Sequence, residues 1–191
     1  MREVIAHLKS ISPYSQSRHY EVEKLAKERP DDYEKRTWRE RMHVSAEGYV
    51  FIPPMAFKNC LSSIARYLGE QIPGKGKSTF TKHFESGVMV LEGLQLPIKK
   101  DQVPGEWLFV PADGKRGSGR RVSKCFPLIA EWHGRVTFHI LDDDTVTKDV
   151  FKNHLEQAGK FIGIGRFRPS NNGYYGRFSI EKLEWVDEIA D

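Results

Sequence analysis

The sequence predicts an α+β fold with a β-α-β-β-α-β skeleton and two insertions. Segments 4–11, 135–141 and 178–186 have alternating apolar residues or apolar residues of the types common in strands. Apolar residues recur at three- and four-residue spacing along 57–68 and 150–162, which is typical of amphipathic helices. Charged or glycine-bearing stretches separate these segments. With a further strand predicted at 88–96, their order along the chain gives the skeleton.

The first strand, 4–11, has apolar residues on both faces and ends before Pro13. Residues 13–47 form the predicted first insertion. Within it, Glu21 to Arg41 holds seven acids and seven bases but few aliphatic residues, so it cannot bury a face alone. Opposite charges recur there at helical spacing, which predicts a helical portion.

A short strand is predicted at 48–52, where aromatic and β-branched residues precede Pro53 and Pro54. It feeds directly into the first helix, for which Gly69 is the expected stop. Strands are also predicted at 88–96 and 106–110.

Residues 97–126 form the predicted second insertion and include a basic loop from 111 to 126. The second helix follows an acidic turn, with Thr145 or Thr147 as its N-cap. Gly159 is one candidate for its end, although the apolar stripe continues to Ile162. The last strand closes the chain.

Composition limits the class of protein. The chain has 191 residues (22.0 kDa), and 39% hydrophobic residues with 12% aromatics exclude a disordered chain. No run approaches the roughly 18 apolar residues of a bilayer span, and no apolar run with a cleavage site opens the sequence. We therefore expect one cytoplasmic domain, 1–191, with no membrane partner. Cys60 and Cys125 are expected to be buried free thiols.

The net charge of +4 is concentrated in two stretches. Residues 71–84 contain three lysines and no acid, and residues 111–126 contain five cations against Asp113 alone. Flexible basic loops of this kind suit a polyanion backbone, because each neutralised phosphate releases a counterion. The alternative is a solvated basic loop that keeps the protein soluble.

The loop between the second helix and the last strand, residues 163–178, is the most informative stretch. Its four glycines allow close approach of a ligand to the backbone, its arginines supply charge, and Tyr174 and Tyr175 offer stacking surfaces. This combination favours single-stranded nucleic acid. The alternative is a tight hairpin whose tyrosines pack inward.

Two nucleotide motifs are excluded. Gly163 and Gly165 lie after a helix and before a strand, the reverse of a dinucleotide-binding fingerprint, and the third glycine is missing. A Walker A loop ending at Lys77 and Ser78 would need glycine at position 71, which is Gln71. No cofactor is implied.

The seven histidines are scattered without metal-site spacing, so no metal is predicted. His19, beside Arg18 and Tyr20, is the best candidate for a general acid or base in RNA cleavage. Asp31 and Asp32 are a second candidate pair, for holding a divalent ion beside a phosphate. The simpler interpretation of both is a solvated surface residue.

Two segments together resemble the RAMP superfamily, the repeat-associated mysterious proteins that include backbone and processing subunits of CRISPR effector complexes. Residues 52–61 are similar to its strand-to-helix junction, and residues 163–178 to its C-terminal glycine-rich loop. Pro54 and Asn59 stand where the family usually has glycine, and Ser62 where backbone subunits often carry arginine.

The resemblance implies a ferredoxin-like fold, similar to an RNA-recognition motif, and single-stranded RNA bound along a basic face. Lys58 would lie near the bound backbone. The two insertions, 13–47 and 97–126, would separate bases and contact neighbouring copies or other effector-complex subunits. The compact length also suits a stand-alone or phage-borne relative.

The sequence thus predicts sequence-tolerant binding of single-stranded RNA or DNA, with RNA favoured, by a subunit that assembles along the strand and has no catalytic residue. The alternatives are a metal-independent RAMP endoribonuclease and a phage-encoded protein-binding mimic of a complex subunit. The residues predicted to contact the strand are Arg18, Lys58, Lys75, Lys77, Lys115, Arg116, Arg120, Arg121, Arg166, Arg168, Tyr174, Tyr175 and Arg177.

Overall fold

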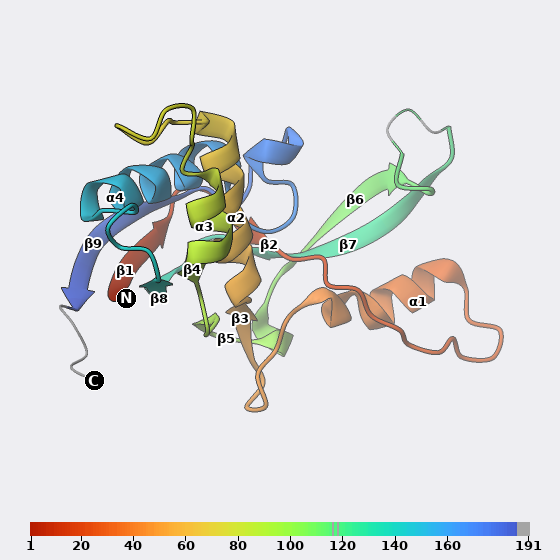
Figure 1. Cartoon of the computed structure of the whole chain (residues 1–191). Coiled ribbons are helices and arrows are strands. Elements are labelled where there is room, and N and C mark those ends of the chain that lie inside the picture. The colour runs from red at the N-terminus through yellow and green to blue at the C-terminus, as the bar shows by residue number, and fades with distance from the viewer. Residues whose placement is uncertain (116, 118, 187–191) are drawn as a thin grey trace.

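The computed structural model describes residues 1–115, 117 and 119–186. Its central layer is a four-stranded antiparallel sheet with the strand order β4-β8-β1-β9, and helices α2 and α4 lie against one face (Figure 1). The elements of this layer are β1 (Arg2–Ser10), α2 (Pro54–Leu68), β4 (Val88–Met89), β8 (His133–Ile140), α4 (Lys148–Gln157) and β9 (Phe178–Val186). Their chain order is β-α-β-β-α-β, so the predicted ferredoxin-like skeleton is confirmed.

The core lies between this sheet and its helices. On β1, Val4, Ala6 and Leu8 are fully buried, because alternate residues of a strand point to the same face. Val4 lies opposite Phe138 of β8. The ring of Phe57, from α2, packs edge-on against that of Phe178 at a centroid distance of 6.4 Å. The apolar stripes predicted for both helices face this core.

The helix ends agree with the sequence signals. Gly69 ends α2 with a left-handed φ of 58°, a conformation that glycine adopts without a steric cost. Of the two candidate caps, Thr147 is the one that precedes α4, where its hydroxyl accepts a hydrogen bond from the Val150 N–H. The chain continues as a π-helical segment, Ala158–Ile162, so the helical stretch reaches the end of the apolar stripe.

The two insertions pair with each other. The first contributes β2 (Tyr14–Ser15), α1 (Pro30–Thr37) and a 3-10 helix (Trp38–Arg41), and the second contributes a 3-10 helix (Lys100–Gln102), β6 (Gly105–Pro111) and most of β7 (Arg121–Ile129). Strand β3 (Tyr49–Ile52) follows the first insertion directly, and β5 (Leu94–Lys99) leads into the second. Together these strands form a three-stranded sheet, β2-β7-β6, and a two-stranded sheet, β3-β5. The β6-β7 hairpin projects from the body beside α1 (Figure 1). A further 3-10 helix, Pro169–Asn171, lies in the glycine-rich loop.

Three details of the predicted elements are wrong. Segment 88–96 is not one strand: β4 and β5 belong to different sheets, and Pro97 lies inside β5. Proline is tolerated there because, in the described part of the chain, β5 pairs with β3 alone. Residues 121–126 are not loop but the start of β7, paired with β6. Helix α3 (Thr81–Gly87) was not predicted.

Two further properties concern the whole described chain. Cys60 and Cys125 are free and buried, as the sequence predicts. None of the helices within residues 1–115, 117 and 119–186 has the length and apolarity needed to cross a membrane.

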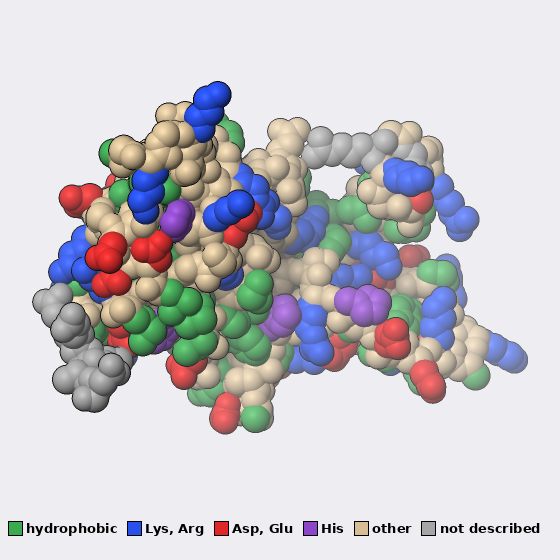
Figure 2. Space-filling model, in the orientation of Figure 1, with side chains coloured by type: hydrophobic (Ala, Val, Ile, Leu, Met, Phe, Trp, Pro, Cys, Tyr) green, Lys and Arg blue, Asp and Glu red, His purple; other side chains and the backbone are tan. Residues whose placement is uncertain are grey.

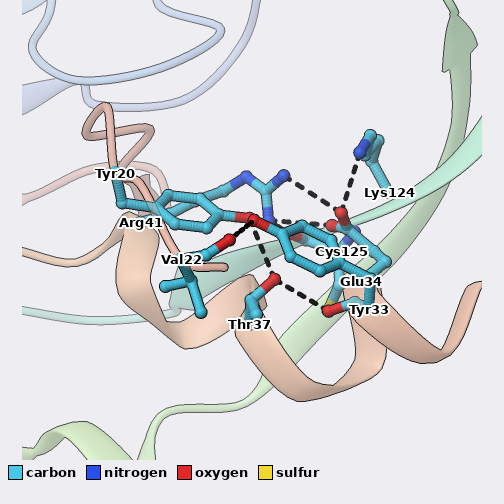
Figure 3. Close-up of polar contacts among 8 residues, drawn as sticks. All are labelled: Tyr20, Val22, Tyr33, Glu34, Thr37, Arg41, Lys124 and Cys125. Carbon is cyan, nitrogen blue, oxygen red and sulfur yellow. Dashed lines mark hydrogen bonds and ion pairs between the residues drawn. The ribbon is translucent and has the colours of Figure 1, made fainter. Parts of the chain in front are cut away.

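A buried ion network holds the first insertion against the edge of the hairpin (Figure 3). The carboxylate of Glu34, on α1, accepts hydrogen bonds from the Cys125 N–H (2.9 Å) and from Lys124 Nζ (2.9 Å), both on β7. Arg41 Nη1 lies 2.8 Å from Glu34 Oε1 and also donates to the Cys125 carbonyl (3.2 Å). Glu34 therefore accepts the hydrogen bond of the Cys125 N–H, and Arg41 donates one to the Cys125 carbonyl.

Two aromatic rings and a pair of hydroxyl groups complete this network around Arg41. Its guanidinium lies between the rings of Tyr20 (5.2 Å) and Phe126 (5.1 Å). Tyr20 and Thr37 share a hydroxyl–hydroxyl hydrogen bond of 3.2 Å, and the Thr37 hydroxyl donates to the Tyr33 carbonyl (Figure 3). The highly charged first insertion thus folds around a paired buried charge and not around an apolar core of its own.

Candidate nucleic-acid interface

A groove of about 680 Å³ lies between the first turns of α2 and the glycine-rich loop. Three segments line it: residues from 14–18, from 53–63 and from 162–171, with His43 beside the first. Lys and Arg side chains gather between the helical body and the projecting hairpin in the same region (Figure 2). The groove therefore combines concave shape with positive charge.

The shape of the glycine-rich loop depends on backbone contacts. Ile164 N–H donates to the Gly176 carbonyl (3.0 Å), and Gly176 N–H donates to the Pro13 carbonyl (2.8 Å). Gly176 has a φ of +75°, and a Cβ at this position would overlap the Ile164 carbonyl oxygen. On the other side, Arg166 N–H donates to the Ser15 carbonyl (2.8 Å). The loop thus packs backbone against backbone, and only glycine fits at position 176.

Three of the predicted arginines line the groove: Arg18, Arg166 and Arg168. The Arg18 side chain is exposed. Arg168 is held in place by donating to the Gly165 carbonyl and the Ser170 hydroxyl, each at 3.0 Å. The structure thus brings together charges from segments that are distant in the sequence.

Arg166 is the most constrained of the three. Its guanidinium lies 3.6 Å above the Phe126 ring, and burial lowers its pKa, an effect that Glu106 opposes. Its Nη1 atom is buried and has no hydrogen-bond partner among the described residues. A buried charged donor without an acceptor is costly, and the nearby Glu106 carboxylate offsets part of that cost.

The two predicted tyrosines differ. The Tyr175 hydroxyl donates to Glu106 Oε1 (2.7 Å), so it joins the loop to the base of β6, and its burial raises its pKa to about 12. The inward-packing alternative therefore holds for Tyr175. Tyr174 is 57% exposed. Arg177 lies beside its ring (5.7 Å) and donates to the Tyr174 and Lys160 carbonyls.

The structure places His43 in the groove, and not His19, the histidine that the sequence singled out. His19 is exposed, lies 3.6 Å from Glu21, and does not line the groove. His43 does line it, and burial, together with the charge of Arg18, lowers its pKa. No motif in the sequence marks His43. Asp31 and Asp32 are exposed in the first turn of α1, and no group of three or more potential metal ligands occurs among the described residues.

Lys58, which the resemblance places near the bound backbone, is not among the residues that line the groove. Its ammonium donates to the carbonyls of Phe84 (2.6 Å) and Glu85 (2.8 Å) and to the Ser62 hydroxyl (3.1 Å). It therefore binds the carbonyl end of α3, where a positive charge is favoured. Burial lowers its pKa.

Replacing Lys58 with methionine is expected to cost stability and not RNA affinity. The two α3 carbonyls would lose their donor, which lowers the free energy of unfolding by about 1–2 kcal/mol. Urea unfolding measures this change, and fluorescence anisotropy with single-stranded RNA measures affinity. Lys152→Met, an exposed lysine of α4, is the matched control. An RNA affinity reduced more than tenfold in a folded Lys58→Met variant would contradict this placement.

The remaining predicted cations lie at separate sites. Lys75 and Lys77 are on the loop before α3, where Lys75 Nζ donates to the Thr145 hydroxyl (3.1 Å). Lys115, Arg120 and Arg121 are exposed around the hairpin tip, and the predicted Arg116 lies outside the described residues. The lysine loop and the hairpin tip lie on opposite sides of α2 (Figure 1). The two basic stretches therefore do not form one patch with the groove.

No protein-family model matches the chain, and no curated protein sequence matches it. Among solved structures, a chain in the cryo-EM structure of the type III-B Cmr-beta bound to cognate target RNA matches with a TM-score of 0.55 and 12% identity. The match covers 97% of this chain and 60% of that one. The crystal structure of Cmr6 from Pyrococcus furiosus matches with a TM-score of 0.48 and 13% identity, over 93% of this chain and 97% of that one. The likeness to the first structure is one of fold, and the fold is the ferredoxin-like α+β fold that the sequence predicts.

Proposed function

We propose that the protein binds single-stranded nucleic acid, RNA in preference to DNA, along the groove between α2 and the glycine-rich loop. The observation that carries this proposal is the convergence of Arg18, Arg166 and Arg168 on one groove. Guanidinium groups match the geometry of phosphate oxygens and can bind them through two parallel hydrogen bonds. The groove therefore binds the backbone of a strand.

The composition of the groove supports binding with little dependence on base sequence. Phosphate contacts carry no sequence information, and exposed rings such as Phe167 (46%) stack on any base. Asn59, Ser63 and Asn171 add amide and hydroxyl groups to the wall. Groups of this type can bond a 2′-hydroxyl, which is the basis for the RNA preference. The neighbour of similar fold comes from a structure of the type III-B Cmr-beta bound to cognate target RNA.

We further propose that the protein works as a subunit of an effector-type complex, beside other subunits or copies of itself. On β6, Trp107 is 47% exposed and Phe109 is 73% exposed, and both lie on the same face of the strand. Exposed aromatic pairs on a projecting hairpin are typical of protein contact surfaces.

Reversing two groove charges is expected to weaken RNA binding more than tenfold at low salt. If four to six phosphates are contacted, the slope of log affinity against log salt is about −3 to −4 for the wild type, and it becomes shallower in Arg18→Glu/Arg168→Glu. Anisotropy with labelled RNA and DNA of about 30 nucleotides at several salt concentrations measures both quantities.

The matched control is Lys35→Glu/Lys152→Glu, which makes the same charge change at exposed positions outside the groove lining. Circular dichroism checks that both variants are folded. A wild-type affinity that does not respond to salt, or equal losses in the two variants, would overturn the proposal. Wild-type protein that binds no RNA would favour the protein-binding alternative.

We propose binding without cleavage, and the same samples test this. One observation favours a ribonuclease: His43 lies in the groove, and burial lowers its pKa, which favours the neutral form that a general base requires. Intact RNA on a gel after incubation with EDTA is the expected result. Cleavage in EDTA that disappears in His43→Ala would show that the protein is an enzyme.

A further inference from the structure

Two aromatic side chains stack on the surface beyond one end of the groove. Tyr67, on the last turn of α2, is 66% exposed, and Phe161, in the π-helical segment, is 49% exposed. Their ring centroids are 6.0 Å apart with an interplanar angle of 25°. We call this pair the aromatic platform. Because neither ring is buried, packing in the core does not account for them.

The platform continues the wall of the groove. Asn59 and Ser63 line the groove, and Tyr67 follows Ser63 by four residues, so the three share one face of α2 about one turn apart. Ile162, the neighbour of Phe161, also lines the groove. In Figure 1, α2 runs upward from β3, so the platform lies at the upper end of this helix. A strand leaving the groove in this direction meets the two rings next.

The charges around the platform suit a phosphate backbone. Lys160 is exposed beside Phe161, and Arg177 Nε donates to the Lys160 carbonyl (3.2 Å), which places a second cation near it. Arg66 is exposed too, but its Nε is paired with Glu85 at 2.6 Å. Lys160 and Arg66 are also chain neighbours of Phe161 and Tyr67, and Ser63 precedes Tyr67 by one turn of α2. An aromatic pair within a polar, cationic border suits one flat base better than a protein partner, which needs a larger apolar patch.

We propose that Tyr67 and Phe161 stack against one unpaired base of the strand that occupies the groove. This inference rests on the proposed function, because the groove delivers the base to the rings. Stacking on aromatic side chains tolerates any base, in agreement with the phosphate-reading groove. The platform would set where along the strand the protein makes its base contact.

The test uses single-stranded RNA labelled with the fluorescent base 2-aminopurine at one position, moved one nucleotide at a time along a set of oligonucleotides. The oligonucleotides are just long enough to fill the site, because a sequence-tolerant groove takes several registers on a longer strand, and wild-type protein is expected to quench strongly at one position. Tyr67→Ala and Phe161→Ala are expected to abolish that quenching and to reduce affinity about 5- to 150-fold. Tyr67→Phe retains a ring and is expected to behave as the wild type.

Leu91→Ala is the matched control, since Leu91 is also 66% exposed and does not line the groove. Thermal unfolding shows whether each variant is folded, and Tyr67→Ala removes little buried surface. If RNA binds with the expected salt dependence but Tyr67→Ala leaves affinity and quenching unchanged, the proposal of base stacking on the platform is wrong, and the proposal of strand binding in the groove is unaffected. If wild-type protein binds no RNA, both proposals fail.

Discussion

Glu34→Ala is expected to lower the free energy of unfolding by about 3–5 kcal/mol, which is the usual cost of removing one partner from a buried ion pair. Glu34 is 1% exposed and Arg41 is 8% exposed. Without the carboxylate, Arg41 becomes an uncompensated buried charge, and the Cys125 N–H loses its acceptor (Figure 3). A loss of this size is a large fraction of the stability of a typical domain.

Urea unfolding measures this effect, with Glu85→Ala as the control. Glu85 pairs with Arg66 at 2.6 Å, but both side chains are exposed, so the control is expected to lose less than about 1 kcal/mol. Glu34→Gln keeps the shape and can still accept hydrogen bonds, so its loss is expected to be intermediate. Equal losses in Glu34→Ala and Glu85→Ala would show that the network does not anchor the insertion.

The same residue predicts a dependence on pH. Burial raises the pKa of Glu34, but hydrogen bonds from Cys125, Lys124 and Arg41 outweigh that effect and hold it below its ordinary value of 4.5. A carboxylate whose pKa is lowered by folding stabilises the protein fully above its unfolded pKa and loses that contribution as pH falls through the folded value. The difference in stability between wild type and Glu34→Gln is therefore expected to shrink below about pH 4.5.

The skeleton could be predicted because its elements carry local signals. Apolar periodicity marks both central helices, and Gly69 and Thr147 mark their ends. Strand β7 was missed because Arg121 and Lys124 lie among its apolar residues, and its pairing with β6 depends on a partner many residues away. The pairing of the two insertions also depends on long-range contacts, such as that between Glu34 and Cys125, which leave no pattern in either segment.

The site could be predicted in part. The glycines and arginines of segment 163–168 point to a ligand-binding loop, and Arg18 joins them across the groove. Lys58 was included through the resemblance alone, and the structure shows it bound to α3. His43 has no motif. The spacing of four residues places Tyr67 on the same face of the predicted helix as Ser63. The sequence does not show that this face lines the groove, so Tyr67 could not be singled out.

Gly176→Ala is expected to have the largest effect on RNA binding of any single methyl addition in the loop. Alanine at a φ of +75° costs about 1–2 kcal/mol, and overlap of its Cβ with the Ile164 carbonyl adds a packing cost, for a total of about 2–5 kcal/mol. The loop would relieve the overlap by separating its two arms. The hydrogen bond from Ile164 N–H to the Gly176 carbonyl would then break, and Arg166 and Arg168 would leave the groove wall.

Gly114→Ala separates the cost of the left-handed backbone conformation from the cost of the Cβ overlap. Gly114 has nearly the same φ, +71°, but a Cβ there meets no atom within 4 Å. It is expected to lose only about 1–2 kcal/mol and to bind RNA as the wild type does. Urea unfolding and RNA anisotropy on both variants give the comparison. A Gly176→Ala protein that is folded and binds RNA more than tenfold more weakly than Gly114→Ala would show that affinity depends on the close packing of the loop. Both positions have a left-handed backbone conformation, so the two variants differ only in the overlap at Gly176. Equal affinities would therefore mean that the arginines bind RNA without the close packing of the loop.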